Sequence, residues 1–333
     1  MTRRAALALA GAAILLALFG LASGQLWIGS FYVNIASQIL IYAILALGLN
    51  VLVGYGGLVS LGHAGLLGVA AYAMAWLLTK GAGQLESAVA ALAATLAVSA
   101  VYAVLSLRAT GIGFLMITLA LGQILWGVAY RWISLTNGDN GIAVSARPMP
   151  FGQSLTSAPA FFCFTSIVFL LAVVSMAIFA ASPLGAGLKG ARDQARRMTT
   201  LGFNVWLIRF LAFLFSGFWS GVAGLLFGYY NQFVSPQMMA LPASAEALLM
   251  VISGGTGTLI GPIAGAALVI VMKNVASAYI ERWNLVLGAI FVAIIIFMPD
   301  GLVPGSVRLS RSVWSKRGTR RGLAAVAARE KAP

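Results

Sequence analysis

Long runs of apolar residues constrain most strongly what this chain can fold into. Of its 333 residues, 61% are hydrophobic and only 8% are charged, whereas about 25% charged residues is usual for a soluble domain. A helix of about 20 apolar residues spans the roughly 30 Å hydrocarbon core of a bilayer. None of the long runs alternates between polar and apolar residues, as the strands of a membrane barrel do. The chain is therefore predicted to be an all-α polytopic membrane protein.

Ten apolar runs are candidate membrane spans. We predict eight to ten transmembrane helices, with ten preferred. The lower number allows for one run that is short and for the two runs that flank residues 54–63, which could be one broken unit. The candidate spans are 5–22, 32–53, 64–79, 86–106, 112–130, 160–181, 209–231, 243–253, 259–278 and 284–299.

The first 24 residues have two interpretations. Arg3 and Arg4 precede an apolar stretch, and Ala22-Ser23-Gly24 offers small residues for cleavage of a signal peptide. The stretch is longer than the core of about 7–15 residues of a typical signal peptide. We favour an uncleaved first helix, since the rest of the chain is already rich in spans.

The basic residues predict the orientation. With ten spans and both termini in the cytosol, 16 of the 21 basic residues lie on the cytosolic side, as the positive-inside rule requires. Residues 1–307 are then a transmembrane domain, and residues 308–333 are a basic, disordered cytosolic tail that contacts anionic lipid. The exceptions are Lys80, Arg131, Arg147, Lys273 and Arg282.

The net charge of +14 does not predict nucleic-acid binding. The basic residues gather in short loops and the tail, and no basic surface with interleaved aromatic residues is visible. The turn-rich external segment 131–158 is either a landing surface for another protein or a solvated connector.

Two glycine-rich segments, 54–65 and 254–265, interrupt the apolar pattern. Glycine costs about 1 kcal/mol in a helix interior relative to alanine, so clusters at membrane depth indicate either broken helices along a solute path or close helix packing. We favour the path, because interrupted segments in both halves of a transporter point to its translocation route. The residues predicted to line or hinge this path are Gly54, Gly56, Gly57, Ser60, Gly62, His63, Glu246, Gly254, Gly255, Gly257 and Gly261.

Two of these residues are ionisable. His63 either contacts a solute or hydrogen-bonds an exposed carbonyl, and we favour the second role. No second ligand accompanies it, so it is not predicted to be a metal site. Glu246 is a functional candidate because carboxylates near membrane depth are costly. It alternatively lies in water at the interface.

Catalysis by this chain is not expected. The sequence has no phosphate-binding loop, no Ser/His/Asp set and no metal-spaced cluster, and Cys163 is a lone cysteine inside an apolar run. A chain of intramembrane acids, as expected for a proton-driven pump, is also missing. We predict no cofactor bound by this chain.

Residues 182–208 form a charged, glycine-punctuated loop between apolar runs, and such a loop needs an aqueous partner. Its predicted docking and shaping residues are Pro183, Gly185, Arg192, Asp193, Arg196, Arg197, Gly202 and Asn204.

The sequence resembles the membrane permeases of branched-chain amino-acid ABC importers, and it is more similar to their M-type subunits than to the H-type partner. The similarity covers roughly residues 35–302. The segments that carry it are 47–50, 54–64, 118–124, 135–142, 182–185, 201–205, 233–236, 244–246, 249–251, 254–262 and 297–302.

The resemblance implies an assembly in a bacterial cytoplasmic membrane: a second homologous permease, two cytosolic ATPase subunits that use ATP and Mg²⁺, and an extracytoplasmic solute-binding protein. It also implies that 182–204 inserts a short coupling helix into the ATPase. Arg196 and Arg197 stand where apolar residues are usual in the family, which implies an unusually acidic ATPase surface. The expected solute is a branched-chain or other amphipathic amino acid. The alternatives are urea, amides or other small organic solutes, or a gradient-driven secondary transporter.

Overall fold

The structure is a computed structural model that describes residues 30–144, 155, 157–279, 283–298, 301–303 and 305. The expected span 5–22 with Arg3 and Arg4, the residues Arg147 and Arg282, and the basic tail 308–333 lie outside the described residues.

The described residues are helical almost throughout, which confirms the helical class. They also contain one short two-stranded sheet. In chain order the elements are α2 (Ser30–Asn50), the π-helix η1 (Val51–Tyr55), α3 (His63–Thr79), α4 (Gln84–Ser106), α5 (Ile112–Arg131), α6 (Ile133–Thr136), the 3₁₀ helix η2 (Gly138–Asn140), β1 (Ile142–Ala143), α7 (Ala158–Ala181), α8 (Pro183–Thr200), α9 (Val205–Asn231), β2 (Phe233–Val234), the 3₁₀ helix η4 (Pro236–Met239), α10 (Leu241–Gly254), α11 (Ile260–Tyr279) and α12 (Trp283–Phe297).

Within the described residues, five helices are long and apolar enough to cross a membrane. They are Phe31–Tyr55, Gln84–Ser106, Ile112–Arg131, Ala158–Ala181 and Val205–Asn231. Three shorter apolar helices accompany them: His63–Thr79, Leu241–Gly254 and Ile260–Asn274. One predicted boundary needs correction, because α9 begins at Val205 and not at residue 209. The Asn204 side chain caps this helix by accepting a hydrogen bond from the Leu207 N–H at 3.0 Å, so Arg209 lies inside α9.

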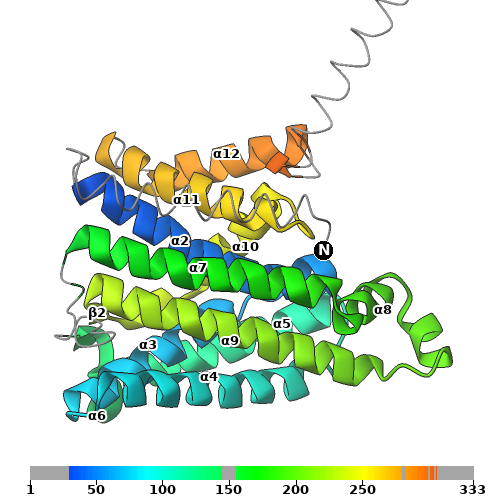
Figure 1. Ribbon diagram of the computed structural model, residues 1–333, viewed down its shortest axis with the longest axis horizontal. Helices are drawn as coiled ribbons and strands as arrows, with labels where there is room; N and C mark the ends of the chain where they lie inside the picture. Colours follow the sequence, from blue (N-terminus) through cyan, green and yellow to red (C-terminus); the bar gives the residue numbers. More distant parts are fainter. Residues whose placement is uncertain are drawn as a thin grey trace, which may run out of the picture.

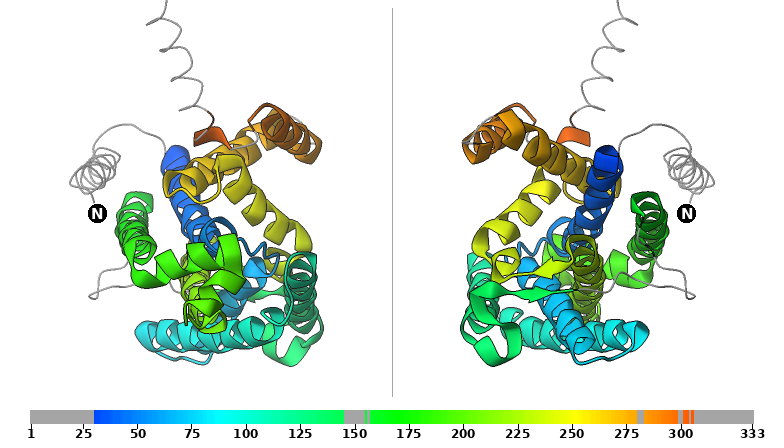
Figure 2. Two further views of the ribbon diagram at one scale, coloured as in Figure 1. Left: turned by 90° about the vertical axis from the view of Figure 1, so that its right-hand side faces the viewer. Right: turned by 90° about the vertical axis from the view of Figure 1, so that its left-hand side faces the viewer.

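The helices lie side by side, with α12 and α4 at opposite edges of the body (Figures 1 and 2). Most of α2 is buried, because α7, α9, α10 and α11 all pack against it. Helix α3 packs against both α4 and α9. The segment that follows α2 is largely buried, with residues 51–56 inside the body, whereas the segment that follows α10 is only partly buried.

Small residues on α9 explain how closely α3 and α4 approach it. A β-carbon at Gly217 would overlap the Ser99 side chain of α4, and one at Gly221 would come 3.1 Å from Thr95 Cγ2. A β-carbon at Gly224 would overlap the Leu67 carbonyl of α3. Such small-residue stripes let backbones touch where lipid supplies no hydrophobic drive for association.

The two ends of the body differ. Helix α8 lies at one end, and β2 and α6 lie at the other (Figure 1). Strands β1 and β2 pair antiparallel with Ile142 opposite Val234, and so tie the segment after α6 to the segment after α9.

Candidate functional site

The first glycine segment begins where α2 changes to a π-helix. Residues 56–62 are not helical, and α3 begins at His63. π-helical turns are rare overall, but those that occur are often located at functional sites. Gly57 has φ +65°, in the region that favours glycine. Its hypothetical β-carbon would come 2.8 Å from Cγ of Arg192. Arg192 therefore fits against this turn only because residue 57 has no side chain.

His63 lies in a chain of buried hydrogen bonds. Its Nδ1 is 2.9 Å from the Ser60 hydroxyl, and its Nε2 is 2.8 Å from the Ser216 hydroxyl of α9. Ser216 in turn donates to the Gly48 carbonyl at 2.6 Å. Because the Ser216 proton goes to that carbonyl, Nε2 is the donor to Ser216 and Nδ1 accepts from Ser60. Both ring nitrogens thus bond serine hydroxyls, and Ser216, not His63, satisfies the Gly48 carbonyl. The predicted hydrogen bond from His63 to a carbonyl is not present.

The second glycine segment connects α10 to α11. Gly255 has φ +115° and Gly257 has φ +77°. A β-carbon at Gly254 would overlap the Gly261 carbonyl. Thr258 closes the turn, since its hydroxyl donates to the Gly255 carbonyl at 3.0 Å and accepts from the Gly261 N–H at 3.0 Å. The turn is thus compact, and glycine is required for both its conformation and its packing.

Asn50 joins the two glycine segments. Its Oδ1 accepts from the Gly257 N–H at 2.9 Å, and its Nδ2 donates to the Thr258 carbonyl at 2.9 Å. The residue is buried. A β-carbon at Gly54 would overlap both Asn50 Oδ1 and the Gly257 nitrogen. Sequence reasoning placed Asn50 in a motif but missed this bridge, which spans 208 positions.

Arg192 of α8 adds a third element to this contact. Its Nη1 donates to the Gly54 carbonyl. Beside it, Leu188 of α8 is buried and lies 3.3 Å from the hypothetical β-carbon of Gly56, and Lys189 lies over the Tyr55 ring at 4.9 Å. We call Asn50, Gly54, Gly257, Thr258 and Arg192 the junction. In it, a helix at one end of the body contacts both glycine segments.

Helix α8 consists of two arms. Ser182 caps its start by accepting from the Gly185 N–H at 3.2 Å, and Pro183 occupies the first helical position. Both are favoured at a helix N-terminus. Gln194 has non-helical angles (φ −149°, ψ 87°), which kink the helix. The expected short helix is therefore an 18-residue kinked element.

The second arm of α8 is exposed. Arg196 and Arg197 are exposed, as is Asp193 next to the kink, whereas Leu188 and Ala191 on the first arm are buried. Gly202, with φ +85°, turns the chain towards Asn204 and α9. Arg209 then donates from Nη2 to the Ala191 carbonyl at 3.1 Å. The first arm is thus held to the body, and the second arm presents charge to the surroundings.

Glu246 lies apart from the junction. It belongs to the second turn of α10, and Lys273 of α11 donates to both of its carboxylate oxygens, at 3.1 and 3.3 Å. The pair lines a cavity with Tyr42, Asn231 and Gln237. Of the predicted path residues, the structure gathers Gly54, Gly57 and Gly257 around Arg192 but does not bring Glu246 to them.

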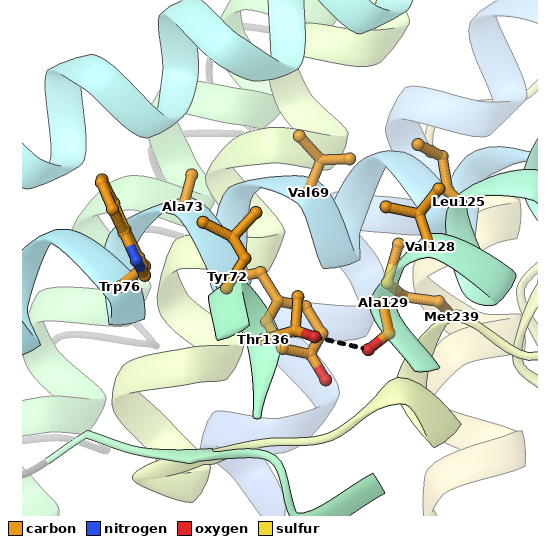
Figure 3. A pocket seen from close by; sticks show the side chains of 10 residues that line it. Val69, Tyr72, Ala73, Trp76, Leu125, Val128, Ala129, Thr136 and Met239 are labelled. Atoms are coloured by element: carbon orange, nitrogen blue, oxygen red, sulfur yellow. Dashed lines mark hydrogen bonds between the residues drawn. The ribbon is translucent and has the colours of Figure 1, made fainter. Parts of the chain in front are cut away.

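A further cavity of about 350 Å³ lies between α3, α5, α6 and η4 (Figure 3). Its lining is largely apolar, and includes Val69, Leu125 and Met239. The Thr136 hydroxyl at its edge already donates to the Ala129 carbonyl at 2.7 Å. This cavity lacks the charged groups that would orient a polar solute.

Apolar helices of membrane-spanning length, joined at a polar junction to a basic exposed helix, define a helical transport permease. The chain belongs to the family of permease components of branched-chain amino acid transport systems. The family model described as "Branched-chain amino acid transport system / permease component" matches residues 31–295.

Individual relatives agree with this assignment. The chain is 31% identical over 306 residues to the "High-affinity branched-chain amino acid transport system permease protein LivM" of Salmonella typhimurium, covering 82% of this chain and 70% of that protein. The LivM protein of Escherichia coli strain K12 matches with the same identity and coverage. The corresponding LivH protein of Escherichia coli strain K12 is 24% identical over 185 residues, covering 52% of this chain and 59% of that protein. The predicted similarity to M-type permeases is confirmed. No solved structure matches the chain.

Proposed function

We propose that this chain is a permease subunit of an ATP-driven importer for branched-chain or other amphipathic amino acids. In this proposal it has ten spans with both termini in the cytosol of a bacterium, and it forms the solute path with a second homologous permease. Two cytosolic ATPase subunits supply the energy, and an extracytoplasmic binding protein delivers the solute. The family membership supports the transport role, and the junction is the observation that carries the coupling.

In the proposed mechanism, α8 transmits the motion of an ATPase. Its exposed arm carries Arg196 and Arg197, which suit an acidic docking surface. Its first arm is tied by Arg192 to the Gly54 carbonyl, and Asn50 connects that segment to Gly257 and Thr258. A displacement of α8 therefore acts on both glycine segments together. The left-handed glycines there accept changes in backbone angle that residues with side chains resist.

Two alternatives differ in solute or energy source. The same type of permease could carry urea or amides, and a secondary transporter would use an ion gradient. The second alternative finds little support in the described residues, where no group of three or more histidine, cysteine or acidic side chains comes together.

The test is uptake by proteoliposomes that contain the complete importer. With the binding protein and ATP present, we expect labelled leucine to accumulate, and excess unlabelled valine to suppress it more than urea or acetamide does. Uptake that persists under a proton gradient without ATP would contradict the proposal. If only urea suppresses the uptake of labelled leucine, the proposed solute class is wrong, whereas the proposed ATP-driven mechanism stands.

A further inference from the structure

The carboxylate–ammonium pair of Glu246 and Lys273 is unusual for its place. Both residues belong to apolar helices, α10 and α11, and charged side chains at membrane depth are costly and mark functional positions. The pair is not sealed, because the side chain of Lys273 is 34% exposed and that of Glu246 is 18% exposed. One ammonium donates to both carboxylate oxygens. A carboxylate has about four acceptor sites, so the carboxylate of Glu246 has room for a further donor.

The cavity beside the pair has a volume of about 440 Å³, which is within the range of about 300–1,000 Å³ for small-molecule sites. Its lining combines three kinds of group. Glu246 and Lys273 supply opposite charges, Asn231 and Gln237 supply amides, and Tyr42 and Phe227 supply aromatic surface. The two rings contact each other edge to face, with centroids 6.0 Å apart.

The cavity lies at the end of the body opposite α8. Its lining includes residues of β2 and η4, and β2 lies at the far end from α8 in Figure 1. If α8 faces the cytosol, as proposed above, this cavity faces the outside, from which an imported solute arrives.

We propose that this cavity is an entry site for a zwitterionic α-amino acid with an apolar side chain. The ammonium of the solute binds Glu246, its carboxylate binds Lys273, and its side chain lies against Tyr42 and Phe227. The four charges then alternate in sign, so that no net charge is buried. A solute with a single charge gains only one of the two ionic contacts, and an uncharged solute gains neither. The site thereby selects amino acids over amines, acids and amides of similar shape.

This inference rests on the proposed function for its orientation and for its solute, but its test separates the two. The first measurement is saturation-transfer NMR on the complete importer in nanodiscs, without the binding protein. The probes are L-leucine, 3-methylbutylamine and 4-methylpentanoate, which share the apolar group and differ in charge. From titrations of this signal we expect a Kd for leucine at least about tenfold lower than for either analogue, equivalent to about 1.4 kcal/mol. Equal Kd values for all three probes would overturn the inference.

Variants of the pair distinguish a binding role from a purely structural ion pair. If the pair only holds α10 to α11, the double variant Glu246→Gln/Lys273→Gln removes both charges together and recovers much of what each single variant loses. For a zwitterion site the double variant stays impaired: the leucine signal falls at least about tenfold and the KM for uptake rises. Recovery in the double variant would overturn the proposal.

Lys80→Gln and Glu86→Gln are the matched controls, because they remove the same two charges from exposed residues outside the cavity. Both are expected to bind and transport leucine normally. Thermal unfolding of each complex identifies variants that fail to fold, and the three-probe comparison on the wild-type protein decides the question even then. Pair-dependent leucine binding without ATP-driven uptake would reject the proposed function and keep this site.

Discussion

At the α8 end of the body, separate segments meet through backbone groups. The Gly54 and Thr258 carbonyls and the Gly257 N–H are bound by single side chains from elsewhere, and glycines leave the space for this contact. At the β2 end, the segments meet through the charged side chains of Glu246 and Lys273, next to a cavity. A contact made of backbone and glycine suits movement, whereas a contact made of partly buried charges beside a cavity suits selection. We therefore propose that the α8 end serves coupling and the β2 end serves recognition.

We expect the largest loss of uptake from substitutions of the glycines at the α8 end. Leucine at Gly255 is strained because φ is +115°, and leucine at Gly57 is strained at φ +65° and meets Arg192. Strain of this kind costs about 1–3 kcal/mol per residue, and the added bulk comes on top of it. We expect Gly255→Leu and Gly57→Leu to abolish leucine uptake in proteoliposomes while the protein still inserts into the membrane.

Gly127→Ala is the control for these variants, since no atom lies within 4 Å of its hypothetical β-carbon. It should transport normally. Normal uptake by both Gly255→Leu and Gly57→Leu would refute the assignment of these segments to the path.

The next effect concerns the exposed arm of α8. Arg196→Glu/Arg197→Glu reverses two exposed charges, and we expect the ATPase subunits to be lost on co-purification, most clearly at low salt, because surface charges act through screened attraction. Mass spectrometry of the purified complex measures this loss. Arg108→Glu reverses another exposed charge and should retain the ATPases. Intact assembly and transport in the double variant would show that these arginines do not dock.

A smaller effect follows at Asn50. Asn50→Ala leaves a buried N–H and a buried carbonyl unsatisfied, at about 1–3 kcal/mol for each group. We expect a lower unfolding temperature and uptake reduced by about tenfold. Asn50→Asp keeps the acceptor for Gly257 and should fall between alanine and wild type. An unchanged unfolding temperature for the alanine variant would exclude the bridge.

The smallest effect is expected at His63, which belongs to neither end. Its two ring nitrogens are occupied by Ser60 and Ser216, so His63→Gln should lower stability by about 1–3 kcal/mol and leave the KM for leucine unchanged. Thermal unfolding and uptake kinetics measure the two quantities. A raised KM at unchanged stability would mean that His63 contacts the solute.

The sequence predicts much of the fold because apolar runs of membrane-spanning length have few alternatives. It also indicates the glycine segments, since clusters of glycine stand out against such runs. The junction was not predictable, because Asn50 and Thr258 are 208 positions apart and one sequence carries no information on long-range pairing. The same holds for Lys273, which the sequence suggested only as an exception to the charge rule, and for the α9 glycines that admit α3 and α4. The start of α9 was misplaced because Arg209 interrupts the apolar pattern, while the cap at Asn204 sets the boundary.

The most direct test of the account is the number of leucine molecules transported for each ATP hydrolysed, measured in proteoliposomes for wild type and Arg192→Ala. Arg192 donates the hydrogen bond that links α8 to the Gly54 carbonyl. The account predicts that Arg192→Ala still assembles and hydrolyses ATP, while leucine transported per ATP falls by at least about tenfold. An unchanged ratio would contradict the claim that α8 drives the glycine segments through this junction.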